Sequence, residues 1–557
     1  MDDPVRRAAI VSHVNSSNAL NPRRRLILWM ALSVVGLSLS VALPAWAADR
    51  ANVPLKNWGG FSLYRDALYD DLERLVTAGM ADGTILNTKP LNRTEAARVV
   101  VRAVRKIRAD EVGSYNARRD LEPVLDRLLA SLGPDIAALG EKVPGVGGPP
   151  PGLVSVTPVD RAQAFAGWAS RHLSLENSQG RRLEHGVNGG VTWESRAQFG
   201  DLLSVYVQPE VLGNEADGAM RLASGYAKLT LANVELLIGR ESIWWGPGLR
   251  GSLTLSNNAA PLDQIRLGVS EPFSIPWVST ATGPMKILGF LAQLEGRRDY
   301  GHAKLAGMRA TIAPLTVLEL GLSYLNTFDG DTRPRPGVSD YPRILFNPTS
   351  SDQRFSDPRF RNNIIMALDG DLRLPNVDRY VPLGRDARVY GEFGWDDTCC
   401  ETAIIPNPGA LSWLVGIHLL GLFGWQDVDG RFEYAQSQRE SFTHDQFYRG
   451  HWTRGEVISH LMGTDGSDLW GRLTNRMLPE LMVGVDLSRS SIGSTVSAFP
   501  GPHETRTGGG VDVSYSFWGG YSLFARYQAM RVRNRDFRSG DDGVDHLLRF
   551  ELTRLFR

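Results

Sequence analysis

The stretch VDVSYSFWGGYSLFARYQAM, Val511 to Met530, decides the fold class. Its first half alternates between two sets of side chains, which are Val511, Val513, Tyr515 and Phe517 against Asp512, Ser514 and Ser516. Gly519-Gly520 then turns the chain into a second alternating segment. Because successive side chains of a strand point to opposite faces, the pattern predicts a β-hairpin with one apolar side.

The same period of two recurs from about Arg161 to the end of the chain. It is present in LLSVYVQPEV, RATIAPLTVLELGLSYL, RVYGEFGW, WLVGIHLLGLFGW and HLLRFELTRLFR. No segment after Asp49 approaches the 18 uninterrupted apolar residues of a membrane helix. The period alone does not separate a soluble β-sandwich from an outer-membrane barrel, because the strands of both alternate.

Three features favour the membrane barrel. Strands tend to end in aromatic residues, which would form a girdle at the membrane interface. These residues are Trp395, Trp413, Trp425, Trp518 and Tyr521. The non-apolar face carries Arg, Glu, His and Asn, and tight hairpins alternate with long loops such as residues 326–363. The final strand is expected to point four residues outward, namely Leu548, Phe550, Leu552 and Phe556. Residues 161–557 therefore predict a transmembrane antiparallel β-barrel of about 16 to 18 strands.

The N-terminus has the features of a secretory signal peptide. Arg23-Arg24-Arg25 precede the apolar run LILWMALSVVGLSLSVAL, which ends in Pro44-Ala45-Trp46-Ala47. The alternative is an uncleaved membrane anchor, since the run nearly reaches spanning length. The small-x-small ending favours cleavage. We therefore predict that residues 1–47 are a signal peptide and that the mature chain is exported.

Between the signal peptide and the barrel, the period becomes helical. A first helix is indicated by apolar residues at three- and four-residue spacing, namely Leu68, Leu72, Leu75 and Val76. Asn92 and Glu95 form a capping-box pair that opens a second helix, and a third is expected over residues 121–132. We assign residues 48–140 to a small periplasmic α-helical domain and the Gly- and Pro-rich residues 141–160 to a linker. The domain resembles a cell-wall-binding module of the S-layer-homology type; a spacer that packs on its neighbour is the favoured alternative.

The composition restricts the classes of partner that the protein can bind. The 61 basic and 61 acidic residues cancel, so the chain lacks the basic field that attracts nucleic acid. The only cysteines are neighbours, Cys399 and Cys400, which is neither a disulfide framework nor C-x-x-C spacing. They are compatible with a vicinal disulfide or with free thiols in a loop.

A second stretch, IGRESIWWGPGLRGSLTLSNNAAP, raises a different question. Its core, Gly246 to Gly251, has the G-x-G-x-x-G spacing of dinucleotide-binding loops. That fingerprint needs a helix after the last glycine and an acidic residue about 20 positions further on. Here SLTLSNNAAP ends in a proline and cannot start the helix, and Asp263 comes too early. We therefore reject a dinucleotide site.

The same stretch closely resembles the most characteristic segment of the Wzi family, outer-membrane proteins of capsule assembly. The family pattern is a strand ending in Gly-Arg or Gly-Lys, a Trp-Gly-Pro-Gly turn and a Ser-x-Asn-Ala-Pro segment. These places are held here by Gly239-Arg240, Trp245 to Gly248 and Ser256 to Pro261, with Ala260 as an extra residue. A later segment, Phe447 to Leu469, is also similar; it keeps the His and Asp of the family but has Ser459 where a glycine is expected.

The resemblance implies an 18-stranded barrel with a periplasmic helical bundle, acting as a lectin that holds capsular or exported polysaccharide at the cell surface. Sugars bind by stacking on aromatic rings while planar polar groups contact their hydroxyls. We predict polysaccharide contacts from Arg240, Trp244, Trp245, Arg250, Asn257, Asn258, His460 and Asp465. The alternative is that the Trp-Gly-Pro-Gly turn is structural, seals the barrel and binds nothing. We expect a monomer in outer-membrane lipid, with the cell wall or polysaccharide export proteins as further candidate partners.

Two rival functions share parts of this pattern. A porin for sugars or other small solutes would have the same period, girdles and wet lumen. An enzyme needs a nucleophile or paired acids, and the chain has no G-x-S-x-G or H-E-x-x-H motif. One His-rich region contains His444, His451 and His460 with Asp445 and Asp465. The spacings of these residues do not place metal ligands on one face of an element. We therefore predict that the histidines are satisfied by hydrogen bonds inside the lumen, and we predict no metal and no cofactor.

Overall fold

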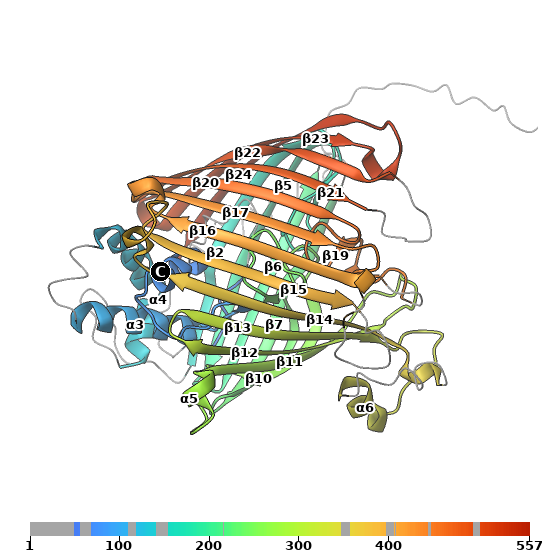
Figure 1. Cartoon of the computed structure of the whole chain (residues 1–557), viewed down its shortest axis with the longest axis horizontal. Helices are drawn as coiled ribbons and strands as arrows, with labels where there is room; N and C mark the ends of the chain where they lie inside the picture. Colours follow the sequence, from blue (N-terminus) through green and yellow to red (C-terminus); the bar gives the residue numbers. More distant parts are fainter. Residues whose placement is uncertain are drawn as a thin grey trace, which may run out of the picture. The chain divides into compact units, whose positions relative to one another are not determined.

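The computed structural model describes residues 49–55, 68–109, 118–140, 154–214, 217–346, 357–396, 406, 408–443, 447–493 and 502–556. Eighteen strands form a closed antiparallel barrel, as predicted. The first of them, β2, closes the barrel by pairing with both β5 and the last strand, β24 (Figure 1). The barrel strands are β2 (Val154–Ala169), β5 (Gly186–Phe199), β6 (Leu203–Asn214), β7 (Gly218–Leu231), β8 (Val234–Glu241), β10 (Leu262–Val269), β11 (Met285–Gln293), β12 (Lys304–Leu315), β13 (Leu318–Phe328), β14 (Asn362–Leu374), β15 (Asp386–Asp396), β16 (Leu411–Leu420), β17 (Val428–Ser437), β20 (Ser467–Leu478), β21 (Leu481–Ile492), β22 (Glu504–Phe517), β23 (Tyr521–Arg533) and β24 (Gly543–Leu555).

Shorter elements lie between the barrel strands. Three two-residue pairs are β1 (Thr88–Lys89) with β9 (Trp244–Trp245), β3 (Leu173–Ser174) with β4 (Arg182–Leu183), and β18 (Trp452–Thr453) with β19 (Glu456–Val457). The α-helices are α2 (Leu68–Thr77), α3 (Arg93–Ala109), α4 (Glu122–Ala138), α5 (Ser279–Thr282) and α6 (Tyr341–Phe346). The 3₁₀ helices are η2 (Arg119–Leu121), η3 (Val338–Asp340), η4 (Pro358–Phe360), η5 (Val377–Arg379), η6 (Pro408–Ala410), η7 (Leu422–Gly424), η8 (Trp518–Gly520) and η9 (Arg535–Phe537). Within the described ranges, no helix has the length and apolar character needed to cross a membrane.

The hairpin of Val511–Met530 forms as predicted, from β22 and β23. Val511 is 47% exposed on the outside, whereas its neighbour Asp512 is 1% exposed on the inside, where it lies opposite Arg526. The last strand behaves alike, since its outward residues Leu548, Phe550 and Leu552 are also exposed. Apolar side chains therefore face out and polar ones face in, which is the arrangement of a membrane barrel.

The two ends of the barrel differ in their connections. At one end, here called the turn end, β5–β6, β12–β13 and β20–β21 are joined by two or three residues each. At the other, the loop end, residues 329–361 connect β13 to β14 and residues 438–466 connect β17 to β20. Trp425 is 69% exposed in a turn-end connection, as a girdle residue should be. Trp395 was expected in the same role but is buried, packed 6.0 Å from the ring of Phe393.

The described residues before β2, namely 49–55, 68–109 and 118–140, form what we call the helical insert. The Asn92 side chain accepts a hydrogen bond from the Glu95 backbone N–H at 2.7 Å, which confirms half of the predicted capping box. The Glu95 carboxylate bonds Lys286 on β11 at 2.7 Å. The third helix runs past Leu132 to Ala138 with Pro134 inside it. These helices lie at the turn end (Figure 1).

The barrel begins earlier than the sequence suggested. Residues 154–160 were assigned to the linker, but they form the first part of β2 and pair with β5 as far as Thr157. Val154 and Val156 point outward and are exposed, so this segment already follows the barrel pattern despite its proline content. The predictions for residues 1–47, 141–153, Cys399, Cys400, His444 and Asp445 lie outside the described residues.

Candidate functional site

The WWGPG stretch folds back into the barrel from the loop end. Residues 242–261, here called the loop insert, connect β8 to β10, and within them β9 pairs with β1 of the helical insert. Thr88 lies opposite Trp245, and the Gly246 N–H donates to the Asn87 carbonyl at 2.9 Å. The Asn257 side chain also donates to the Leu55 carbonyl. The two inserts, one from each end, are therefore joined by backbone hydrogen bonds inside the lumen.

The glycines of the loop insert are required by close packing. Gly246 has a φ of +131°, which residues with a side chain rarely adopt, and a Cβ there would lie 2.3 Å from Glu392. A Cβ on Gly251 would lie 2.2 Å from the His460 ring, and one on Gly248 would lie 2.2 Å from the Gly251 carbonyl oxygen. The G-x-G-x-x-G spacing thus reflects a tightly packed irregular chain rather than a phosphate-binding loop.

Two carboxylates of the barrel wall accept hydrogen bonds from the backbone N–H groups of this irregular segment. Glu433 on β17 accepts hydrogen bonds from the Leu249 and Arg250 N–H groups, at 2.6 and 2.8 Å. Glu392 on β15 accepts one from the Leu253 N–H at 2.8 Å. A buried loop without such partners would carry unpaired N–H groups, each costing roughly 1–3 kcal/mol. These two glutamates therefore hold the loop insert in place.

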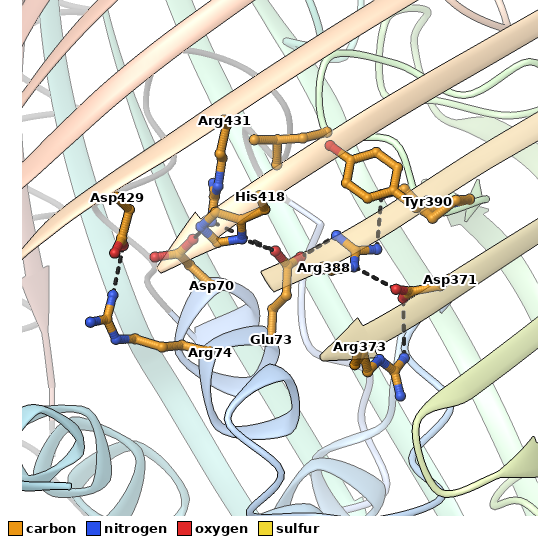
Figure 2. A network of polar contacts seen from close by, with 12 residues as sticks. Asp70, Glu73, Arg74, Asp371, Arg373, Arg388, Tyr390, His418, Asp429 and Arg431 are labelled. Carbon is orange, nitrogen blue, oxygen red and sulfur yellow. Dashed lines mark hydrogen bonds and ion pairs between the residues drawn. The ribbon is translucent and has the colours of Figure 1, made fainter. Parts of the chain in front are cut away.

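Ion pairs join α2 to the barrel wall inside the turn-end half of the lumen (Figure 2). The Glu73 carboxylate lies 3.0 Å from Arg388 and 2.9 Å from His418. Burial by itself raises the pKa of Glu73, but Arg388 and His418 outweigh it and hold that pKa well below its usual value. Asp70 pairs with Arg431, and Arg74 pairs with Asp429 at 2.6 Å.

Arg388 links the two inserts to the wall. Besides Glu73 of the helical insert, its guanidinium bonds Asp371 on β14 at 2.9 Å and the Pro247 carbonyl of the loop insert at 3.0 Å. Its planar fork also lies 4.5 Å from the Tyr390 ring. These contacts join the helical insert and the loop insert to the wall as one connected unit, here called the plug. Removing one partner of such a buried ion pair leaves an uncompensated charge.

Most of the predicted polysaccharide contacts are buried in this plug. Trp244 and Trp245 are both 0% exposed; the first packs in the core of the helical insert and the second against Phe290. Arg250 is held by Glu176 and Asp468. Also buried are Asn257, Asn258 and His460. In this conformation none of the six can stack on or hydrogen-bond a sugar, because a ligand must reach the side chain. Their placement favours the structural alternative.

The other two predicted contacts are accessible, but they lie outside the buried segment that contains the tryptophans. Arg240 points outward from β8 and makes two 2.6 Å hydrogen bonds to Asp263. Asp465 is exposed in the loop between β17 and β20, where it lies 3.1 Å from the exposed His503. The eight residues that the sequence grouped into one site are therefore divided between the plug, the outward face and the loop end.

His451 and His460 are buried, but the prediction that they are fully hydrogen-bonded is confirmed only in part, because His451 Nδ1 and His460 Nε2 have no hydrogen-bond partner among the described residues. The His451 Nε2–H donates a hydrogen bond to the Thr254 carbonyl at 2.6 Å. His460 lies 4.0 Å from Asp468. Burial lowers the pKa of each ring to about 4, so both are neutral at pH 7. No group of three or more metal-ligating side chains is found in the ranges that the structure describes.

A cleft of about 140 Å³ lies in the inner wall near the loop end. Phe165 of β2 lines it, with Asn188 from β5, Asn214 from β6 and Arg182 from β4. The rest of the lining is Leu183, Gly189, Leu212, Gly213, Asp217, Gly218 and Ala219. Arg182 is tethered by a 2.8 Å hydrogen bond to Glu456. Phe165 and Asn188 are buried in this wall, whereas Arg182 and Asp217 are exposed, so a guanidinium and a carboxylate are the groups that a sugar hydroxyl can reach.

Sequence reasoning missed these cleft residues and the two glutamates. Phe165, Asn188 and Asn214 come from three neighbouring strands and are brought together by the register of β2 with β5 and of β5 with β6. Glu392 and Glu433 appear in the sequence as ordinary polar residues of alternating strands. One signal was available, because acidic residues that point into a lumen beside an irregular glycine-rich segment are suited to pair with its N–H groups.

A family model described as "Capsule assembly protein Wzi" matches residues 166–547. The chain belongs to the Wzi family. The match runs from β2 to β24 and so covers the barrel, while the helical insert lies before it. Like the family, this protein is an outer-membrane β-barrel.

Two similar proteins support the assignment to the Wzi family. An "uncharacterized 55.8 kDa protein in cps region" of Klebsiella pneumoniae is 25% identical over 399 residues, which are 70% of this chain and 65% of that protein. The chain thus aligns with slightly less than two thirds of that relative. The structure of Escherichia coli Wzi, described as a carbohydrate-binding β-barrel involved in group 1 capsule assembly, has a TM-score of 0.65 at 20% identity. The match covers 88% of this chain and 98% of the E. coli Wzi chain, and it shows that the two proteins share a fold.

Proposed function

We propose that this protein is a non-catalytic lectin that holds capsular or exported polysaccharide at the cell surface through its loop end. In this orientation the turn end and the helical insert face the periplasm, because outer-membrane barrels have short periplasmic turns and long outer loops. The protein acts as a monomer in contact with outer-membrane lipid. The carbohydrate binding named for E. coli Wzi agrees with this function.

The observation that carries the proposal is the junction of the two inserts inside the barrel. A porin needs a continuous aqueous path, whereas β1 and β9 pair in the lumen and Arg388 ties both inserts to the wall. Opening a path would break these contacts and leave buried charges unpaired, at a cost of several kcal/mol each. A plugged barrel is suited to bind at its mouth rather than to conduct.

The cleft of Phe165, Arg182, Asn188 and Asn214 is the proposed sugar-binding position. At about 140 Å³ it is smaller than the roughly 300–1,000 Å³ of drug-sized ligand pockets, which suits one sugar unit of a chain that continues across the loops. Arg182 is 39% exposed at the cleft and can contact a hydroxyl or an acidic group. We retain Asp465 as a possible loop contact, because its carboxylate is exposed.

The test is to delete the gene and to weigh the polysaccharide that stays on the cells against that shed into the medium. If the protein is a lectin, the total amount of polysaccharide should be unchanged while the cell-associated fraction falls. Returning the intact gene should restore the cell-associated fraction. Unchanged retention with altered uptake of small solutes would instead indicate a porin. A change in the length or linkage of the polysaccharide chains would assign the protein a catalytic role.

A further inference from the structure

Three arginines on the outward face near the loop end are without a protein partner. Arg489 lies on β21, and Arg531 and Arg533 lie on β23. All three side chains are exposed, and none makes a hydrogen bond, ion pair or ring contact with any residue in the described ranges. This contrasts with Arg526 on the inward face of the same strand, which pairs with Asp486 and Asp512. Unpartnered guanidiniums are available to a ligand outside the barrel.

The strand register gathers these arginines into one patch. Thr507 of β22 lies opposite Arg489 on one side and Arg531 on the other. Since neighbouring strands are about 4.8 Å apart, the two arginine backbones are roughly 10 Å apart with an exposed hydroxyl between them. Arg533 lies two residues further along β23, on the same face. Three like charges this close repel one another unless an anion lies among them.

The patch lies at the upper edge of the apolar band. Leu487, two residues below Arg489, is 69% exposed, and Tyr527, four below Arg531, is 49% exposed. From Leu523 to Arg531 the outward face of β23 runs for eight residues, or about 27 Å along the strand at 3.4 Å per residue. With a strand tilt of about 40°, this is roughly 21 Å along the membrane normal, close to the ~25 Å height of an apolar band. The guanidiniums therefore lie at the level of the lipid headgroups.

We propose that Arg489, Arg531 and Arg533 bind the phosphate groups of a phosphorylated glycolipid in the outer leaflet. Guanidiniums bind phosphate oxygens in a bidentate manner, and Thr507 can bond a sugar hydroxyl between them. The assignment to the outer leaflet rests on the proposed function, which places the loop end outside the cell. An acidic polysaccharide is a less suitable partner, because the side chains point toward lipid and are level with its headgroups rather than above them.

The test uses the full-length barrel in detergent and native mass spectrometry. The probes are a purified, acylated glucosamine disaccharide carrying two phosphates and the same lipid after removal of both phosphates. One variant carries Arg489→Gln, Arg531→Gln and Arg533→Gln, and a second carries lysine at all three positions. The control is Arg554→Gln, an outward arginine at the turn end that lies 5.0 Å from the Tyr521 ring. Each variant is first checked for heat-modifiable migration in gels, which reports a closed barrel.

We expect the protein to bind the bisphosphorylated lipid at least tenfold more tightly than the dephosphorylated one. An arginine near an anionic surface contributes a factor of about five, so the glutamine variant should lose about 100-fold and stop discriminating between the lipids. The lysine variant should have intermediate affinity, because lysine keeps the charge but not the bidentate geometry, and the Arg554 control should keep the full affinity. Equal binding of the bisphosphorylated lipid by the glutamine variant and the unaltered protein would overturn the proposal.

The same variants separate lipid binding from polysaccharide binding. The titration contains no polysaccharide, so its result does not depend on whether the lectin proposal holds. If the glutamine variant keeps its lipid discrimination but sheds polysaccharide from cells, the arginines serve the polysaccharide and the lipid assignment is wrong. If it loses lipid discrimination and cells still retain polysaccharide, the patch and the lectin site are independent, as we expect.

Discussion

Truncating either buried tryptophan of the loop insert should destabilise the barrel. Trp244 and Trp245 are both 0% exposed, and a buried tryptophan removes about 150–250 Å² from water. At about 25 cal/mol per Å² this corresponds to roughly 4–6 kcal/mol, in line with the ~3–5 kcal/mol measured for such truncations elsewhere. We therefore expect Trp244→Ala and Trp245→Ala to lower the temperature at which the folded gel band is lost by more than about 6 °C, at ~2–4 °C per kcal/mol.

The controls distinguish packing from sugar contact. Trp245→Phe should be mild, because the indole N–H of Trp245 has no hydrogen-bond partner among the residues that the structure describes and a ring still fills the site. Trp425→Ala, at a 69% exposed position, should shift the midpoint little. Retention of polysaccharide on cells should fall only in proportion to the loss of folded barrel. A Trp244→Ala variant with normal abundance and thermal midpoint that nevertheless sheds polysaccharide would refute the reasoning.

Three further predictions concern the plug and are read from the same thermal midpoint. Gly251→Ala should be strongly destabilising, because its Cβ would lie 2.2 Å from the His460 ring, whereas Gly471→Ala, with no heavy atom closer than 3.9 Å, should be tolerated. Glu73→Gln should be destabilising by up to roughly 3–5 kcal/mol, because Arg388 keeps only Asp371 and His418 loses its carboxylate partner; a midpoint equal to that of the unaltered protein would contradict the ion-pair account. The folded-state pKa values of His451 and His460 are about 4, below the unfolded value near 6.5, so stability should be constant above pH 6.5 and fall between pH 6.5 and 4 by up to about 1.4 kcal/mol per pH unit for each ring. A flat midpoint from pH 7.5 to 4.5 would show that neither ring is buried and neutral.

The barrel could be predicted from the sequence because its pattern is local. Each strand alternates by itself, so Val511 and Asp512 reveal their faces without knowledge of any neighbour. The three helices were also predictable from spacing and from the Asn92 cap. The end of the linker was not, because glycine and proline content predicted a break where Val154 and Val156 in fact begin β2.

The site could not be predicted because its residues meet only through the closed barrel. The sequence identified WWGPG as unusual but could not show whether its rings face sugar or protein, and burial depends on a helical insert more than 100 residues earlier. Arg388 illustrates the difficulty, since its partners Glu73, Asp371 and Pro247 come from three distant segments. The cleft around Phe165 has the same origin.

The most direct measurement is the binding of purified polysaccharide to purified barrel, with and without the cleft side chains. We predict that the double variant Arg182→Ala, Asp217→Ala weakens binding at least tenfold while the barrel stays closed, because each of these exposed side chains can contribute a hydrogen bond of ~1 kcal/mol to a sugar. The control Arg171→Ala, at a 53% exposed loop-end position beside Asp545, should bind normally. Unchanged affinity in the double variant would contradict the cleft as the binding site, and the absence of binding by the unaltered barrel would contradict the lectin function itself.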